Sequence, residues 1–302
     1  MASTQPMRVY FAHIPKTAGT SLITEMIAPK GALTHYLIGN RADVVSGEVC
    51  VPTLMEQMRS ERGAVRPVSV VFLRAPRTHL VSMHAKCNAA FISQRAPPEK
   101  VALKRGVMAW VTEYEKHVLN STERWGCYSP YNMQTRAFLC DSSRDVKLPL
   151  KALAPRAYIY WQSSHALWHS STMEDKRRDA SGSDIVRAID TMRALDVVGV
   201  TEYYLTSLCL VLDRVKRYGS RTLPPWCDCR QTNATAMQGA PSVHKGVNAK
   251  GHVTNSAHTA EQEATLSQVL FADEQLYAAG LVRFREDVRR VEAERSVRLL
   301  CD

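Results

Sequence analysis

The stretch VYFAHIPKTAGTSLITEM, residues 9–26, gathers side chains that bind anions directly in front of a helical pattern. It combines a lysine, hydroxyl side chains and two small residues, namely Lys16, Thr17, Ala18, Gly19, Thr20 and Ser21. The first amides of a helix have no partner within the helix and carry partial positive charge. A helix start with a lysine beside it can therefore bind a phosphate or sulfate group.

This loop needs a strand before it and a helix after it. Residues 9–14 are rich in β-branched and aromatic side chains, which predicts a buried strand. The apolar residues that follow recur at helical spacing: Leu22, Ile23, Met26 and Ile27. The sequence therefore predicts a strand, a tight loop and a helix in direct succession.

Three further short apolar runs have the composition of strands: VSVVFL at 68–73, AYIYW at 157–161 and DVVGV at 196–200. Continuous apolar runs are typical of strands that are covered on both faces. Such strands belong to a mainly parallel sheet with helices on each side. We therefore expect an α/β fold with a central, mainly parallel sheet flanked by helices.

Helices are expected between and after these strands, within one domain spanning residues 1–302. Their predicted ranges are 98–119, 183–195, a segment from Glu202 capped by Thr201, 260–279 and 281–298. Residues 221–259 are rich in Pro, Gly, Asn, His and Thr, which predicts a long loop region. The last part of the chain, 260–302, is expected to pack as helices on the core.

The formal net charge of +10 comes from 39 Lys and Arg against 29 Asp and Glu. Such a charge attracts phosphate, sulfate, polyanionic glycans or nucleic acid, and charge alone does not choose among them. The five tryptophans are scattered and do not alternate with basic residues, as they would in a surface that binds single-stranded nucleic acid. Nucleic acid is therefore not an expected partner.

The compartment stays open on sequence evidence. Eight cysteines and two glycosylation sequons, at Asn120 and Asn233, fit a lumenal or secreted protein. Against this, the first strand begins close to Met1, and no run resembles a signal core or a membrane span. Cys227 and Cys229 could hold a metal, but no second pair follows at ligand spacing, so no metal is expected.

Two motifs resemble a known family. HIPKTAGTS, residues 13–21, is similar to the phosphosulfate loop of the Golgi-type carbohydrate sulfotransferases, which include the heparan and uronyl 2-O-sulfotransferases. VVFLRAPRTHLVS, residues 70–82, resembles their second signature, in which Arg74 ends a strand and Ser82 follows eight residues later. Segments beginning at Tyr131, Val197 and Asp273 resemble later family blocks in the expected order, so the resemblance covers most of the chain.

The resemblance implies a P-loop kinase-like sulfotransferase fold and a co-substrate, 3'-phosphoadenosine 5'-phosphosulfate. Residues 16–21 would surround the 5'-phosphosulfate end, and Lys16 would also offset charge as the sulfuryl group leaves. Arg74 and Ser82 would bind the 3'-phosphate. The implied acceptor is a hydroxyl group of a carbohydrate, with an acidic glycan agreeing with the positive net charge. The implied compartment is the Golgi lumen, with the cytoplasm as the alternative.

The catalytic base is the point at which the sequence departs from the family. The 2-O-sulfotransferases carry a Gly-His-Val segment whose histidine is the base, whereas this chain has SGEVC with Glu48 in that place. A carboxylate can accept the hydroxyl proton when desolvation raises its pKa. His35 is the competing candidate, and it could equally be a core or strand residue.

Two basic or polar segments are candidates for acceptor binding. Asn132, Gln134 and Arg136 could line an acceptor groove or could serve as helix surface and capping residues. The loop SVHKGVNAKGH could close over the donor or carry only solvated charge; its basic residues are His244, Lys245, Lys250 and His252.

Two other function classes remain as alternatives. A P-loop nucleotide kinase would place Gly-Lys-Ser/Thr at the end of its loop, whereas Lys16 precedes Gly19 here. A non-catalytic protein that binds sulfated or phosphorylated ligands on the same fold would keep the donor site and lack turnover.

Overall fold

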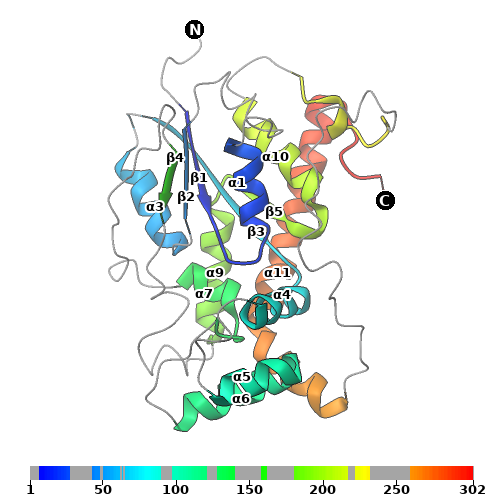
Figure 1. Ribbon diagram of the computed structural model, residues 1–302. Helices are drawn as coiled ribbons and strands as arrows, with labels where there is room; N and C mark the ends of the chain where they lie inside the picture. The colour runs from blue at the N-terminus through cyan, green and yellow to red at the C-terminus, as the bar shows by residue number, and fades with distance from the viewer. Residues whose placement is uncertain are drawn as a thin grey trace.

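A computed structural model describes residues 7–27, 43–47, 50–61, 63, 65–89, 97–120, 128–139, 158–161, 180–216, 222–231 and 259–301. Within these residues, five strands form one sheet in the order β4-β2-β1-β3-β5, and every neighbouring pair is parallel. The strands are β1 (Met7–Ala12), β2 (Asp43–Gly47), β3 (Arg66–Leu73), β4 (Tyr158–Trp161) and β5 (Val197–Val200). Figure 1 shows helices on both sides of this sheet, which confirms the predicted α/β class.

The described helices connect or flank these strands. They are α1 (Gly19–Ile27), α3 (Val51–Ser60), α4 (Pro76–Ala89), α5 (Pro97–Arg105), α6 (Val107–Asn120), α7 (Met133–Leu139), α9 (Gly182–Arg193), α10 (Tyr204–Lys216) and α11 (Ala260–Arg295). Two short 3-10 helices, η3 (Thr201–Tyr203) and η4 (Pro225–Cys227), precede and follow α10.

The core lies on both faces of the sheet because successive side chains of a strand point to opposite faces. On one face, Tyr10 packs with residues of α3, α4, α6, α7 and α9. On the other face, Phe11 packs with residues of α1, α10 and the second half of α11. Both side chains are fully buried. The apolar run of β1 is therefore explained by cover on both sides.

Two predicted boundaries are wrong, and a glycine explains each of them. The expected helix 98–119 is broken into α5 and α6 at Gly106, whose φ of 110° lies outside the helical range. The expected break near residue 280 does not occur, since α11 is one helix. Gly280 is instead a point of close packing, because a Cβ there would lie 2.4 Å from Leu73 Cδ1.

Asn132 joins the start of α7 to the middle of α11. Its backbone N–H donates to Val269 O at 3.2 Å, and its Oδ1 accepts from the N–H groups of Ala272 and Asp273 at 3.0 and 3.1 Å. The side chain thus enters the helix's own hydrogen-bond ladder, a common cause of helix bending. Figure 1 shows the orange first part of α11 at an angle to its red part.

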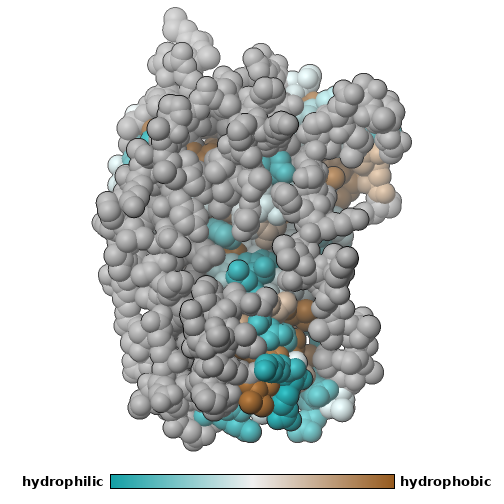
Figure 2. Space-filling model, viewed as in Figure 1, coloured by the Kyte–Doolittle hydropathy of each residue, from teal (hydrophilic) through white to brown (hydrophobic). Residues whose placement is uncertain are grey.

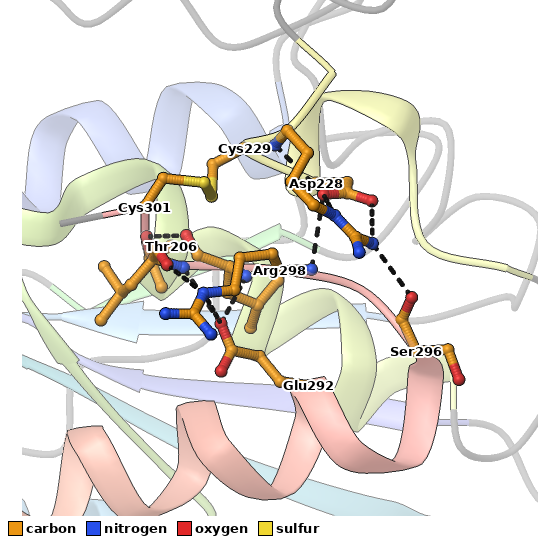
Figure 3. The surroundings of a disulfide bond; sticks show 10 residues. Thr206, Asp228, Cys229, Glu292, Ser296, Arg298 and Cys301 are labelled. Carbon is orange, nitrogen blue, oxygen red and sulfur yellow. Dashed lines mark hydrogen bonds and ion pairs between the residues drawn. A yellow bond between two sulfur atoms is a disulfide. The ribbon is translucent and has the colours of Figure 1, made fainter.

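Disulfides anchor the end of the chain. Cys209 pairs with Cys227, and Cys229 pairs with Cys301. Figure 3 shows the second disulfide beside Asp228, which accepts hydrogen bonds from Arg230. Among the described residues no cysteine is a free thiol. The two thiols considered as metal ligands are therefore joined to different partners.

The exposed large apolar side chains of the described residues are Val101, Val186, Phe271 and Val282, and they are spread over three helices. Among the residues coloured in Figure 2, those near the lower end are mostly hydrophilic, with a smaller hydrophobic area among them. No helix in the described part of the chain has the length and apolar character that a membrane span requires.

Candidate functional site

The candidate site lies where the loops after β1 and β3 leave the sheet. These two strands are neighbours and run parallel, so their carboxyl ends lie at the same edge. The chain passes from β1 to β2 on one side and then to β3 on the other side of β1. Ligands of open α/β sheets bind at the carboxyl edge where the strand order reverses in this way.

The loop between β1 and α1 has an unusual backbone. Lys16 and Ala18 have φ values of 67° and 66°, which side chains other than glycine seldom adopt. Thr17 is fully buried, and both its N–H and its hydroxyl donate to Ile14 O, at 3.3 and 2.8 Å. Thr17 therefore stabilises the loop from within, whereas the sequence predicted that it would bind the donor directly.

The start of α1 carries no acceptor at its cap. Ala18 O accepts the first intrahelical bond, from Leu22 N–H at 2.9 Å, so Ala18 is the N-cap residue. Alanine has no side-chain acceptor, and the first turn contains no acidic residue. In contrast, α9 and α11 each begin with a complete capping box. The amides of residues 19–21 at the start of α1 are thus placed to bind an anion.

Arg74 follows directly after β3, as the sequence predicted, and contacts the β1–α1 loop. Its Nη1 donates to Lys16 O at 3.1 Å, and its Nε donates to Thr78 Oγ1 at 3.3 Å. Partial burial lowers the pKa of the guanidinium from its usual value, and the negative charge of Glu202 acts in the opposite direction. This hydrogen bond to Lys16 therefore joins the two signature segments, and the contact of His79 with Pro15 O joins them a second time.

Glu202 organises the start of α4 beside Arg74. Its carboxylate accepts from Ala75 N–H at 3.0 Å, from Thr78 Oγ1 at 3.3 Å and from Tyr277 Oη at 3.2 Å. The preceding residue, Thr201, was predicted to cap a helix. It donates instead to Leu73 O at 3.0 Å and links the ends of β3 and β5.

Gln134 holds the backbone of Arg74 from the other side. Its Nε2 donates to Arg74 O at 2.8 Å, and its Oε1 accepts from Arg74 N–H at 2.9 Å. Asp273 in turn accepts from the N–H groups of Gln134 and Thr135, at 3.2 and 2.7 Å. Gln134 and Asn132 thus make buried contacts with other elements, which the predicted alternatives of an acceptor groove or of helix surface and capping did not include. Arg136 is half-buried and donates to Ser129 Oγ at 3.2 Å.

Two buried histidines support the loop, and sequence reasoning did not single them out. His79 on α4 is fully buried, and its Nε2 lies 2.7 Å from Pro15 O. The ring of His13 stacks on Phe11 and fills the space beside Gly19, where a Cβ would lie 1.7 Å from the ring. Burial is the main cause that lowers the pKa of each histidine to about 4. The signal for His79 was its place among the apolar residues of a helix, next to Leu80 and four residues before Met83.

The structure describes only some of the remaining residues that the sequence predicted for the site. Ser82 is buried on α4, two turns after Arg74. Glu48, His35 and the basic segment from His244 to His252 lie outside the described residues. The structure therefore brings the β1–α1 loop and the start of α4 together, and Glu48 and His35 stay predictions for the base.

Two surface hollows of about 450 and 460 Å³ lie away from this site, one along α5 and α6 and the other along α3 and α9. The described residues contain no group of three or more His, Cys, Asp or Glu side chains arranged to hold a metal ion. No protein-family model matches the chain, and no curated protein matches its sequence. The candidate site is therefore argued from its residues and their geometry.

Proposed function

We propose that this protein is a sulfotransferase of the P-loop kinase-like sulfotransferase fold. It would move a sulfuryl group from 3'-phosphoadenosine 5'-phosphosulfate to a hydroxyl group of a carbohydrate. The observation that carries the proposal is the hydrogen bond from Arg74 to Lys16 O. Through this bond the β1–α1 loop and the start of α4 lie next to each other, which supports the proposal that they bind the two anionic ends of one donor molecule.

The residues present fit this donor. The open amides at residues 19–21 and the ammonium group of Lys16 suit the 5'-phosphosulfate end. A guanidinium has five N–H donors. Arg74 uses two of them in its bonds to the described residues, so three stay available for the 3'-phosphate. Ser82 would add a hydroxyl group from α4.

The donor supplies the sulfuryl group, and the protein would supply position, charge and a base. Lys16 would offset the negative charge that develops on the phosphate as its bond to the sulfuryl group breaks. The acceptor hydroxyl would lose its proton to Glu48 or His35 as the new oxygen–sulfur bond forms.

An acidic glycan is the acceptor class that we propose, because the net charge of +10 attracts polyanions. The disulfide pairing of the described cysteines supports maturation in an oxidising compartment such as the Golgi lumen. Cys227 and Cys229 are each in a disulfide and do not form a pair of thiolates.

The donor site is tested by calorimetric titration with adenosine 3',5'-bisphosphate, the donor's product. We expect binding that Arg74→Ala weakens roughly 10-fold or more, because a charged hydrogen-bonded contact is lost. Arg77→Ala is the matched control. It removes the same charge from an exposed side chain that pairs with Glu263, and it should leave affinity unchanged. Absent binding, or equal binding of ATP with magnesium, would refute the proposal and favour the kinase alternative.

Turnover separates an enzyme from a non-catalytic binder. Labelled donor is incubated with a panel of acidic and neutral glycans, and transfer of label is measured for the unmodified protein, Glu48→Gln and His35→Ala. We expect transfer to an acidic glycan, lost in the variant that lacks the base and with product affinity preserved. Binding of the bisphosphate without transfer to any glycan would favour the non-catalytic alternative.

A further inference from the structure

His79 and the β1–α1 loop meet inside the protein. The imidazole Nε2 lies 2.7 Å from Pro15 O, and the side chain has no exposed surface. A carbonyl oxygen only accepts, so Nε2 carries the hydrogen and donates it. The other ring nitrogen, Nδ1, is buried without a hydrogen-bond partner among the described residues. The ring is therefore a neutral imidazole of one defined tautomer.

An unpaired buried nitrogen calls for an explanation, because burying an unsatisfied polar atom is unfavourable. An aliphatic side chain would fill the same space without this penalty. Burial, together with the positive charges of Arg74 and Lys16, lowers the pKa of His79 to about 4, against a smaller opposing effect of the bond to Pro15. Histidine thus provides an N–H donor beside two cations without adding a third positive charge.

The hydrogen bond from His79 fixes one peptide plane. In a trans peptide the carbonyl and the following N–H point in opposite directions. Holding the Pro15 carbonyl toward α4 therefore turns the N–H of Lys16 toward the opposite side of the loop. Arg74 holds the next carbonyl, that of Lys16, and Thr17 holds that of Ile14. Three consecutive carbonyls of the loop are thus held by donors from named residues.

We propose that His79 is a positioning residue for donor binding, which turns the peptide between Pro15 and Lys16 so that the loop presents its N–H groups to the donor's phosphate. This inference rests on the proposed function for its ligand. The loop geometry that it describes can be measured without that ligand.

His84 provides a matched control on the same helix. It is also buried, and its Nε2 donates to a backbone carbonyl, that of Leu103 at 3.0 Å. Leu103 belongs to α5, so this bond ties α4 to another helix and does not reach the loop. Replacing either histidine by leucine removes one buried hydrogen bond to a carbonyl. Only the His79 replacement should alter the site.

The experiment uses the full chain with His79→Leu, His79→Gln and His84→Leu. Glutamine carries an N–H the same number of bonds from Cα as histidine Nε2, so it can restore the bond to Pro15. Hydrogen exchange of residues 13–22 is measured without ligand, and the affinity for adenosine 3',5'-bisphosphate is measured by calorimetry. Melting temperatures establish that each variant is folded.

We expect His79→Leu to speed exchange in residues 13–22 and to weaken bisphosphate binding about 10-fold. His79→Gln should restore both toward the values of the unmodified protein, and His84→Leu should change neither. Unchanged exchange and affinity in folded His79→Leu would overturn the inference and leave the proposed function standing. If the unmodified protein binds no bisphosphate, the proposed function fails, and the exchange data alone decide whether His79 sets the loop.

Discussion

The side-chain amide of Gln134 binds both backbone groups of Arg74, donating to the carbonyl at 2.8 Å and accepting from the N–H at 2.9 Å. In effect Gln134 continues the hydrogen bonding of β3 for one residue beyond the sheet. The residue that would bind the 3'-phosphate is therefore held at its backbone as well as at its guanidinium group.

Replacing Gln134 by methionine should destabilise the protein and weaken bisphosphate binding together. Gln134 is 1% exposed, so both backbone groups of Arg74 would lose their partner in a buried place. We expect a loss of about 1–3 kcal/mol in the free energy of unfolding, measured by urea denaturation. Gln57→Met is the control, since Gln57 makes a hydrogen bond to Glu61 on α3, away from the site. A stable variant with normal affinity would show that the Arg74 backbone does not need this support.

Replacing Gly19 by alanine should destabilise the loop through His13. The added Cβ would lie 1.7 Å from the buried ring, which must move. We expect a loss of about 1–3 kcal/mol in the free energy of unfolding. Gly182→Ala is the control, because a Cβ at Gly182 meets no atom within 4 Å.

The cause of the Gly19 effect can be tested with a double-mutant cycle. In the background of His13→Ala, the substitution Gly19→Ala should cost less than it does in the unmodified protein, because the ring is gone. Equal costs in the two backgrounds would mean that the clash with His13 is not the reason.

Asp273 should make the protein less stable as the pH rises from about 4 to about 6. Burial raises the pKa of this carboxyl from its usual 3.8 to about 6, despite its hydrogen bonds to Thr135 and Gln134. Between these values the folded state binds more protons than the unfolded state, so this contribution to stability is present below pH 4 and is lost through pH 6.

The comparison with Asp273→Asn isolates this effect. Subtracting the two unfolding curves at each pH removes the contributions of His13 and His79, whose lowered pKa values act in the opposite direction. We expect the difference in unfolding free energy to change steadily between pH 4 and pH 6 and to be flat above pH 7. A change of the opposite sign would mean that the hydrogen bonds from Thr135 and Gln134 lower the pKa of Asp273 more than burial raises it.

Cutting the last disulfide with Cys301→Ser should lower the free energy of unfolding by about 2–4 kcal/mol. Cys301 is exposed, so the substitution leaves little unfilled space, and the disulfide joins positions 72 residues apart. Denaturation is measured with and without a reducing agent. Under reduction the variant and the unmodified protein should differ far less, and a persisting difference would point to packing in place of the crosslink.

The strands with continuous apolar runs were predictable, among them the edge strands β4 and β5, whereas the interior strand β2 was not. β1 and β3 consist of long apolar runs, since helices cover both of their faces. β2 and α3 were not predicted. β2 has only five residues, DVVSG, and its apolar content is too short to distinguish it from a loop. Its place is set by pairing with β1 and β4, which is information that a local pattern does not contain.

The position of a candidate site residue was predictable where it depends only on the residue's own strand and loop. Arg74 follows directly after β3, and Lys16 lies in the loop between β1 and α1, as the motifs indicated, while their binding roles stay predictions. The supports of the site come from residues distant in sequence, such as Gln134, Glu202 and His79, and their partners are backbone groups. Nearly every residue type has a backbone N–H and a carbonyl group, so a contact with backbone groups does not produce a recognisable sequence motif. For the same reason the sequence predicted that Thr17 binds the co-substrate, whereas its N–H and hydroxyl group donate hydrogen bonds to Ile14 O.

The insertion of Asn132 into the ladder of α11 has an evolutionary consequence. Its side-chain oxygen accepts hydrogen bonds from two consecutive backbone N–H groups of α11, which lie about 140 residues further along the chain. A substitution at position 132 would leave backbone groups of α11 unpaired unless the helix changed its course at residues 269–273. Because the partners in α11 are backbone groups, residues 269–273 can change in identity, but a homologue that loses the asparagine should show a straightened helix.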